Sequence, residues 1–221
     1  MQKFDTAAAL VTTLAVPAGR IRIIATDRTD TTVDIQPADS SKSRDVNTAR
    51  RTDVTYTDGV LRIEVPKTKN GILGDTGSIE VTVQLPAGSR VEAQAAAAEL
   101  TTTGRLGDVT FEGAYRQIRI DEAASLRLTA ADGDIEIGRL TGSADITTAR
   151  GDIHVAQALA GTVNLTTQKG DITLAATTGV SATLDAGTAY GRVTNSLKND
   201  GIPALSIRAT TSYGDITARS L

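Results

Sequence analysis

Short runs of alternating apolar and polar residues recur through the second half of the chain. In Ala144–Ile146 and Val163–Leu165, for example, two apolar residues flank a polar one. A period of two sends one set of side chains inward and the other into water, which predicts β-strands. Each run leads to a glycine, and a second run with the same period follows it, as in Ile153–Val155 and Ile172–Leu174.

The glycine between paired strands is followed by aspartate and a β-branched residue. The copies are Gly107-Asp108-Val109, Gly133-Asp134-Ile135, Gly151-Asp152-Ile153, Gly170-Asp171-Ile172, Gly214-Asp215-Ile216 and the degenerate Gly191-Arg192-Val193. Subtraction of residue numbers places successive glycines 26, 18, 19, 21 and 23 residues apart. Repetition at this period predicts a solenoid, in which each coil buries its apolar face against the next.

The Gly-Asp phrases are expected to form corners of the solenoid. Glycine suits a corner where the backbone needs positive φ or a close approach to the neighbouring coil. The aspartate that follows can accept hydrogen bonds from backbone donors in the turn. We therefore interpret these aspartates as turn-capping residues that recur at one corner, with Arg192 standing between Asp171 and Asp215. The aspartates are Asp108, Asp134, Asp152, Asp171 and Asp215.

The N-terminal part predicts strands and hairpins. Strands around Val54–Tyr56 and Val60–Val65 flank Asp58-Gly59, a strong hairpin signal. The polar stretch Pro37–Arg51 and the glycine-containing stretch Lys67–Ser78 are predicted to be loops.

The run Ala93–Ala98 has the composition of a helix, because alanine favours one. The flanking Val91 and the repeat beyond it favour a strand of a narrow coil instead, and we predict a strand.

Together these patterns predict an all-β fold, a parallel β-solenoid (β-helix-like) with N-terminal β-hairpins capping the stack. Residues 1–221 would form a single elongated domain, with strands and hairpins in 1–88 and Gly-Asp-Ile coils in 89–221. A cap is expected because the open end of a sheet exposes backbone groups that can pair with another chain.

Composition and charge narrow the range of possible functions. The 221 residues include 23 basic and 26 acidic side chains, a net charge of −3, which does not favour nucleic-acid binding. Cysteine is absent, so disulfides and thiolate metal sites are excluded. Asp5 stands where the apolar region of a signal peptide would begin, so the N-terminus does not predict a signal peptide. No apolar run is long enough to span a bilayer. With Met1 as the native start, this predicts a cytoplasmic protein without membrane insertion.

No catalytic constellation stands out. His154 is the only histidine, and alternation points it outward between Ile153 and Val155. No serine has a Gly-x-Ser-x-Gly context, and a single histidine disfavours zinc. Stacked aspartates could hold calcium, but turn capping is the favoured interpretation. We expect no enzyme activity, no metal and no cofactor.

One outer edge carries the candidate binding residues. They come from the residue before each corner glycine and from the degenerate phrase, and they are Lys169, Tyr190, Arg192 and Tyr213. Adjacent aromatic and cationic groups can hold a sugar, an anionic polymer or a partner protein. The alternative is a ladder that only stiffens the corner.

The combined pattern resembles a bacterial β-strand-repeat family, domain of unknown function 4097, whose members are also called “putative adhesins”. The residues that carry the resemblance are Gly19–Ile23, Gly59–Ile63, Ile79–Gly88 and the Gly-Asp-Ile phrases, so it covers nearly the whole chain. The resemblance implies a β-helix-like stack and no established catalytic activity. The adhesin label implies a surface location.

These arguments lead to a non-enzymatic structural or interaction module. Its partner would be another protein, or a second copy joined through a solenoid end. Two alternatives stay open. One is a cell-surface adhesin, and the other is a carbohydrate-binding or carbohydrate-active β-helix in which Asp132 and Asp134 would perform acid–base chemistry.

Overall fold

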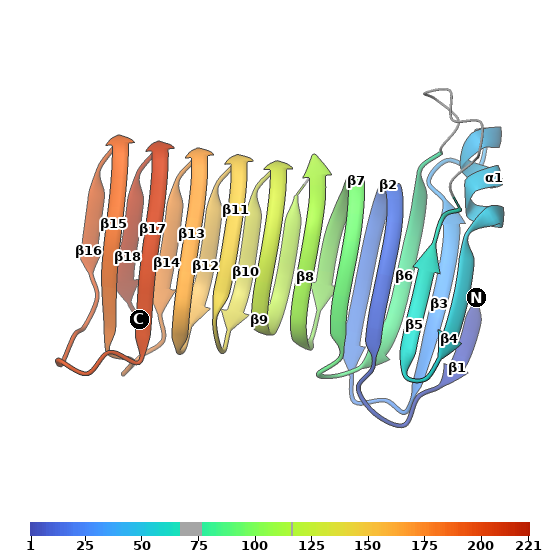
Figure 1. The fold of residues 1–221 in the computed structure, drawn as a ribbon, viewed down its shortest axis with the longest axis horizontal. Coiled ribbons are helices and arrows are strands. Elements are labelled where there is room, and N and C mark those ends of the chain that lie inside the picture. The colour runs from blue at the N-terminus through green and yellow to red at the C-terminus, as the bar shows by residue number, and fades with distance from the viewer. Residues whose placement is uncertain (67–76, 116) are drawn as a thin grey trace.

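The computed structural model describes residues 1–66, 77–115 and 117–221. Most of the loop expected at Lys67–Ser78 lies outside the described residues. The chain forms a long row of strands with one helix at the N-terminal end (Figure 1). The elements before the regular coils are β1 (Gln2–Asp5), β2 (Val11–Thr26), β3 (Asp30–Pro37), α1 (Ser43–Arg51), β4 (Asp53–Thr57), β5 (Val60–Glu64), β6 (Ile79–Pro86), β7 (Arg90–Thr103) and β8 (Arg105–Tyr115).

The remaining strands form the coils. They are β9 (Ile118–Asp132), β10 (Ile135–Leu140), β11 (Ala144–Arg150), β12 (Ile153–Ala158), β13 (Gly161–Lys169), β14 (Ile172–Ala176), β15 (Ala182–Tyr190), β16 (Val193–Ser196), β17 (Leu205–Tyr213) and β18 (Ile216–Ser220). The predicted all-β solenoid is confirmed.

Two sheets run the length of the molecule. We call the sheet containing β11, β13, β17 and β15 the front sheet, and the sheet containing β10, β12, β14, β18 and β16 the back sheet (Figure 1). The long strands β2, β7 and β9 bend from one sheet into the other. Coil-to-coil pairing is parallel, so the chain rises in the front sheet, turns at a Gly-Asp corner and descends in the back sheet.

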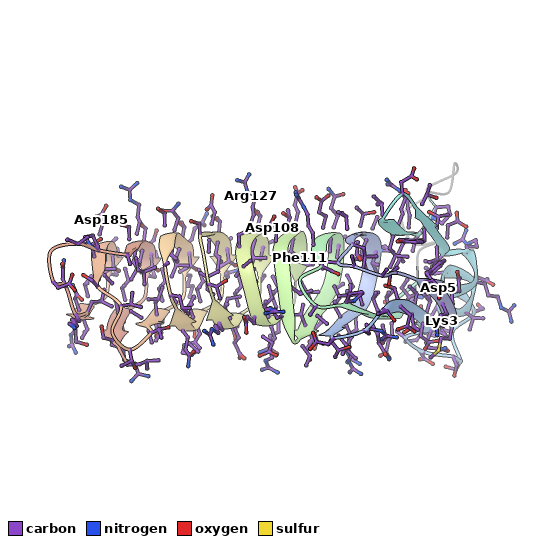
Figure 2. The ribbon with its side chains drawn as sticks, turned by 90° about the horizontal axis from the view of Figure 1, so that it is seen from below. Lys3, Asp5, Asp108, Phe111, Arg127 and Asp185 are labelled. Carbon is purple, nitrogen blue, oxygen red and sulfur yellow. The ribbon has the colours of Figure 1, made fainter. Side chains whose placement is uncertain are left out.

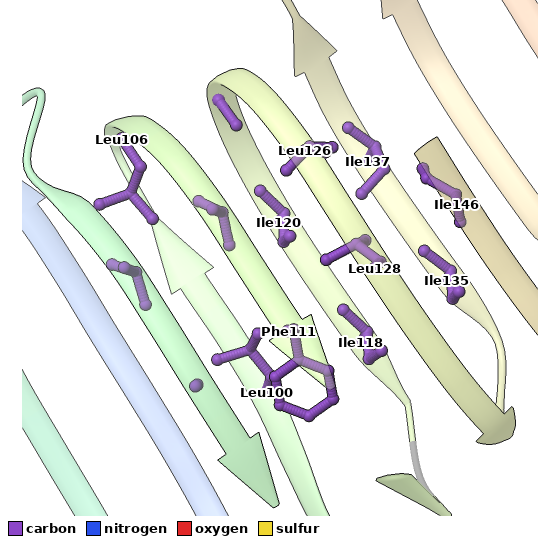
Figure 3. Close-up of a cluster of buried hydrophobic side chains, with 14 of the residues drawn as sticks. Leu100, Leu106, Phe111, Ile118, Ile120, Leu126, Leu128, Ile135, Ile137 and Ile146 are labelled. Carbon is purple, nitrogen blue, oxygen red and sulfur yellow. The ribbon is translucent and has the colours of Figure 1, made fainter. Parts of the chain in front are cut away.

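The register stacks like residues on like residues. Ile135, Ile153 and Ile172 are successive partners in the back sheet, and Leu128 pairs with Ile146 in the front sheet. A slip of one residue would turn each apolar set outward, so the buried face fixes this register. Figure 3 shows Leu128, Ile135 and Ile146 among the buried side chains of this core, and Figure 2 shows Phe111 inside the stack and Arg127 outside it.

The N-terminal end departs from parallel coils. β3 is antiparallel to both β1 and β6, and β4 and β5 form an antiparallel hairpin. The predicted hairpin turn is confirmed, since Asp58 and Gly59 have φ of 53° and 77°, the positive values that a two-residue turn of this kind requires. The predicted strand at Ala93–Ala98 is also confirmed within β7.

The loop expected at Pro37–Arg51 is wrong for its second half, where α1 forms. Its buried residues are the polar Asp45 and Thr48. Asp45 accepts a hydrogen bond from the Ser78 backbone at 2.9 Å, and Thr48 accepts one from the Gly77 backbone at 2.9 Å. Because polar contacts instead of an apolar stripe anchor the helix, the hydrophobic pattern did not reveal it.

The order of coils in space differs from their order in the chain. β17 pairs with both β13 and β15, and β18 pairs with both β14 and β16. The coil formed by β17 and β18 therefore lies between the two coils that precede it in sequence, and β15 and β16 form the end of the stack (Figure 1). We call β15 and β16 together the end coil.

Candidate functional site

A ladder of aspartates joins the corners of successive coils. The backbone N–H of Asp152 donates to Asp134 Oδ1 at 2.9 Å, and the N–H of Asp171 donates to Asp152 Oδ1 at 2.7 Å. The N–H of Asp215 donates to Asp171 Oδ1 at 2.7 Å. The carboxylates of Asp134, Asp152 and Asp171 thus each accept a backbone hydrogen bond from the neighbouring coil, whereas the turn-capping interpretation placed the donors within the same turn.

Asp108 lies outside this ladder. Its register partner is Ser125, whose hydroxyl donates to Asp108 Oδ1 at 2.6 Å. The phrase Gly107-Asp108 stands where β8 crosses from the back to the front sheet, so it occupies the opposite corner from the other Gly-Asp phrases.

Arg192 ends the aspartate ladder. Its backbone N–H donates to Asp215 Oδ1 at 2.8 Å. The expectation that Arg192 stands between Asp171 and Asp215 is wrong, because the coil of β17 and β18 is inserted before the end coil. No coil is stacked on Arg192 within the described residues, so its position needs no carboxylate acceptor. The single arginine in the repeat thus marks the end of the stack.

The residues before the corner glycines form a second ladder along the front sheet. In spatial order they are Asp132, Arg150, Lys169, Tyr213 and Tyr190. The rings of Tyr213 and Tyr190 are stacked, with centroids 4.9 Å apart and an interplanar angle of 4°. Both are exposed, Tyr190 to 67% and Tyr213 to 56%. Three of the four candidate binding residues therefore stand side by side, with Arg192 two residues beyond Tyr190.

The acidic residues considered for catalysis have other partners. Asp132 forms an ion pair with Arg150 at 2.9 Å, and Asp134 accepts the Asp152 hydrogen bond. His154 is exposed on the outer surface of the back sheet, in register with Glu136 and Thr173. In residues 1–66, 77–115 and 117–221, no three His, Asp or Glu side chains converge as metal ligands. Among the same residues, no helix is long and apolar enough to cross a bilayer.

Exposed apolar side chains gather at the C-terminal end of the stack. The large hydrophobic residues exposed in the described part of the chain are Met1, Tyr190, Val193, Ile202, Tyr213 and Leu221. All except Met1 belong to the last two coils or their connections. Val193 is 42% exposed, although its register partner Ile216 is buried. The end of the hydrophobic core is therefore open here.

The outer edge of the end coil also presents backbone groups. Leu205 N–H donates to the carbonyl of Ser181, just before β15, on the inner side, whereas Ala182 N–H donates to Lys198 O on the outer side. Successive residues of a strand direct their backbone groups to opposite edges. The N–H and C=O groups of Leu184, Ala186 and Thr188 consequently point outward, and no strand in the described residues pairs with this edge.

Sequence reasoning did not identify this outer edge. It depends on the inserted coil, which exchanges the positions of the last two coils. One signal was present in the sequence: the inward positions of β16 are Val193 and Asn195, whereas those of β18 are Ile216 and Ala218. A polar asparagine at an inward position suits a coil that is covered on one side only.

Known proteins share this arrangement of strands. A family model described as Toastrack DUF4097 matches residues 13–220. The structure of a “putative adhesin” from Bacteroides fragilis is 15% identical with a TM-score of 0.57, and the match covers 98% of this chain and 95% of that chain. One from Parabacteroides distasonis is 13% identical with a TM-score of 0.53, covering 98% and 95%. No curated protein matches the sequence. At these identities the structural likeness establishes the fold.

Proposed function

The chain belongs to the Toastrack DUF4097 family, a family of unknown function, and we propose that it is a non-enzymatic structural module that associates with a second copy through its end coil. The observation that carries this proposal is the unprotected outer edge of β15. Protein binding, not catalysis, is what an open strand edge beside exposed apolar side chains can perform.

Beyond Ala182, whose N–H is taken by Lys198 O, the edge of β15 lacks the usual protections against pairing. Edge strands in soluble proteins are commonly short, charged, interrupted by proline or covered. β15 has nine residues, no proline and one charged side chain, Asp185. That carboxylate is already paired with Arg208 of β17 at 3.1 Å. β16 carries no charge at all.

The edges at the N-terminal end are different. β1 has four residues, of which Lys3 and Asp5 are charged, and Lys3 pairs with Asp30 at 3.1 Å. β4 has five residues and begins with Asp53. Short charged strands resist edge pairing, so the end coil is the surface that favours association.

Sedimentation velocity across a concentration series tests the proposal. We expect the monomer to convert reversibly to a larger species as concentration rises. Ala186→Pro removes an outward N–H that β17 does not use, and Val193→Lys places a charge at the open end of the core. Each substitution should shift the association to at least tenfold higher concentration.

Thr210→Lys is the matched control, because Thr210 is exposed on the front sheet but lies in the inner strand β17. It should associate as the unmodified chain does. A monomer at every concentration, or equal association by all three variants, would contradict the proposal.

A second candidate function, glycan binding by an adhesin, is favoured by the tyrosine stack. The similar structures are described as “putative adhesins”, and exposed aromatic rings beside Lys169 offer a flat face and a cation to a sugar. A glycan array with the full chain tests this. Tyr190→Ala and Tyr213→Ala should each abolish a detected signal while Tyr190→Phe retains it. Absence of a signal, or an unchanged one, would reject this function.

A further inference from the structure

We infer that two copies form a closed dimer about a two-fold axis, with β15 of each copy antiparallel to the other and the axis passing Ala186. The inference rests on the self-association proposed above and supplies its geometry. The partner is an identical edge, and identical strand edges related by a two-fold axis pair with each other antiparallel.

The outward backbone groups fix which residues exchange hydrogen bonds. They belong to Leu184, Ala186 and Thr188, as the contacts of Ser181 and Ala182 on either edge establish. An axis at Ala186 places Ala186 opposite its own copy and Leu184 opposite Thr188 of the other copy. Directly opposed residues that point toward each other exchange two hydrogen bonds, so every outward group among these three finds a partner.

The axis lies at Ala186 for two reasons. Lys198 O already accepts the outward N–H of Ala182, and the outward groups that remain, those of Leu184, Ala186 and Thr188, are centred on Ala186. A shift of the axis to Asp185 would set two Asp185 carboxylates directly opposite each other, and opposed like charges destabilise a strand pair. In the inferred register Asp185 faces Gly187, which has no side chain and no neighbouring atom within 4 Å of its would-be Cβ.

The same axis brings the open ends of the two cores together. Ile216 N–H donates to Arg192 O at 2.8 Å, so by alternation the backbone groups of Val193 and Asn195 point outward from β16. β16 (Val193–Ser196) follows the corner directly and lies on one side of an axis that passes Ala186, so β16 does not overlap its copy and the strand pairing is confined to β15. Leu184 and Val193, which are incompletely buried in one chain, then contact the partner, and the two cores become continuous.

This geometry predicts a dimer that does not grow further. The β15 edge of each end coil is used in the two-fold contact, which is closed. Outside the end coil, the strand edges left unpaired within the described residues are β1 and β4, the short charged strands at the N-terminal end. A head-to-tail contact would instead build a filament.

Cysteine pairing tests the register, and the chain contains no native cysteine. Asp185→Cys and Gly187→Cys are made separately, mixed in equal amounts and oxidised. In the inferred dimer these positions face each other as a non-hydrogen-bonded pair with Cα atoms about 4.5 Å apart, which is within disulfide range. The mixture should give at least fivefold more covalent dimer than either variant oxidised alone.

A second pair of cysteine variants tests the same register in case one of the first pair fails to fold. Thr183→Cys and Ala189→Cys face each other in the same register and should behave alike, whereas Asp145→Cys mixed with Thr147→Cys, in the inner strand β11, should not cross-link. Sedimentation of the reduced variants is run in parallel. Dimers that cross-link without preference for the mixtures would overturn the inferred geometry and leave self-association standing. Monomers throughout would overturn both.

Discussion

Asp152 binds the coil that is stacked upon it: its Oδ1 accepts a hydrogen bond from the backbone N–H of Asp171 at 2.7 Å. The same contact recurs from Asp171 to Asp215 at 2.7 Å. The carboxylate at one corner accepts the backbone N–H of the next corner, and this charge-assisted hydrogen bond offsets the mutual repulsion of the stacked carboxylates. The repeated Gly-Asp phrase is therefore a structural device of the corner.

Removal of one ladder carboxylate should weaken the stack measurably. Asp171→Ala leaves the N–H of Asp215 without its protein acceptor, and we expect the free energy of unfolding to fall by about 1 kcal/mol. Urea unfolding monitored by circular dichroism measures it. Asp145→Ala is the control, since exposed Asp145 makes no hydrogen bond or ion pair with side chains elsewhere in the described residues. Equal effects of the two substitutions would contradict the capping role.

Truncation of matched aliphatic residues in the last two coils tests their spatial order. Ile207 of β17 is buried, whereas Leu184 of β15 is its register partner and only half-buried. Ile207→Ala should lower the free energy of unfolding by about 3 kcal/mol, because it leaves a cavity between two coils. Leu184→Ala should lower it by about 1 kcal/mol. The reverse ranking would show that β15 is the inner strand.

The corner glycines should not tolerate a side chain. Gly170 has φ of 153°, and a Cβ there would overlap the carbonyl oxygen of Gly151. Gly170→Ala should therefore destabilise the fold by about 2 kcal/mol or more in thermal or urea unfolding. Gly187→Ala serves as the matched control in the end coil, where a Cβ meets nothing within 4 Å. We expect its effect to stay within about 0.5 kcal/mol; comparable losses would refute the close approach at the corner.

Acid should weaken the N-terminal end through Asp30. Hydrogen bonds from Arg28 and then Lys3 lower the pKa of Asp30 from 3.8 to about 2. Because the folded-state pKa lies below the unfolded one, the ionised carboxylate stabilises the fold above pH 3.8, and this contribution is lost as the pH falls toward 2. Urea unfolding at pH values across that window should show a shallower pH dependence for Asp30→Asn than for the unmodified chain. Identical slopes would exclude this contribution.

The solenoid could be predicted because its determinants are local. Alternation in short runs such as Val163–Leu165 fixes the inward face, and the spacing of the glycines fixes the coil. The capping role of Asp152 follows from the same regularity, since each coil presents the same donor to the same acceptor. Even the alanine-rich stretch in β7 follows from its place in a narrow coil, despite its helical propensity.

The order of the last coils could not be predicted because it depends on a choice between compatible partners. β13 could accept either β15 or β17, since both present apolar residues at alternate positions: Ala182 and Leu184, or Leu205 and Ile207. β17 carries the larger inward apolar side chains, Leu205 and Ile207, and these are buried between two coils in the observed order. The proximity of Tyr190 and Tyr213 was predicted, but their direct ring stacking requires this insertion.

The insertion of β17 and β18 means that the molecule cannot be completed in the order in which it is synthesised. When the ribosome has released β15 and β16, the place they finally occupy does not yet exist, because the coil beneath them is still to be made. These strands must stay unpaired until β17 and β18 are made, or first pair with β13 and β14 and later be displaced. Shortening the chain by its last coil would thus remove an interior layer and leave the outermost one without its support.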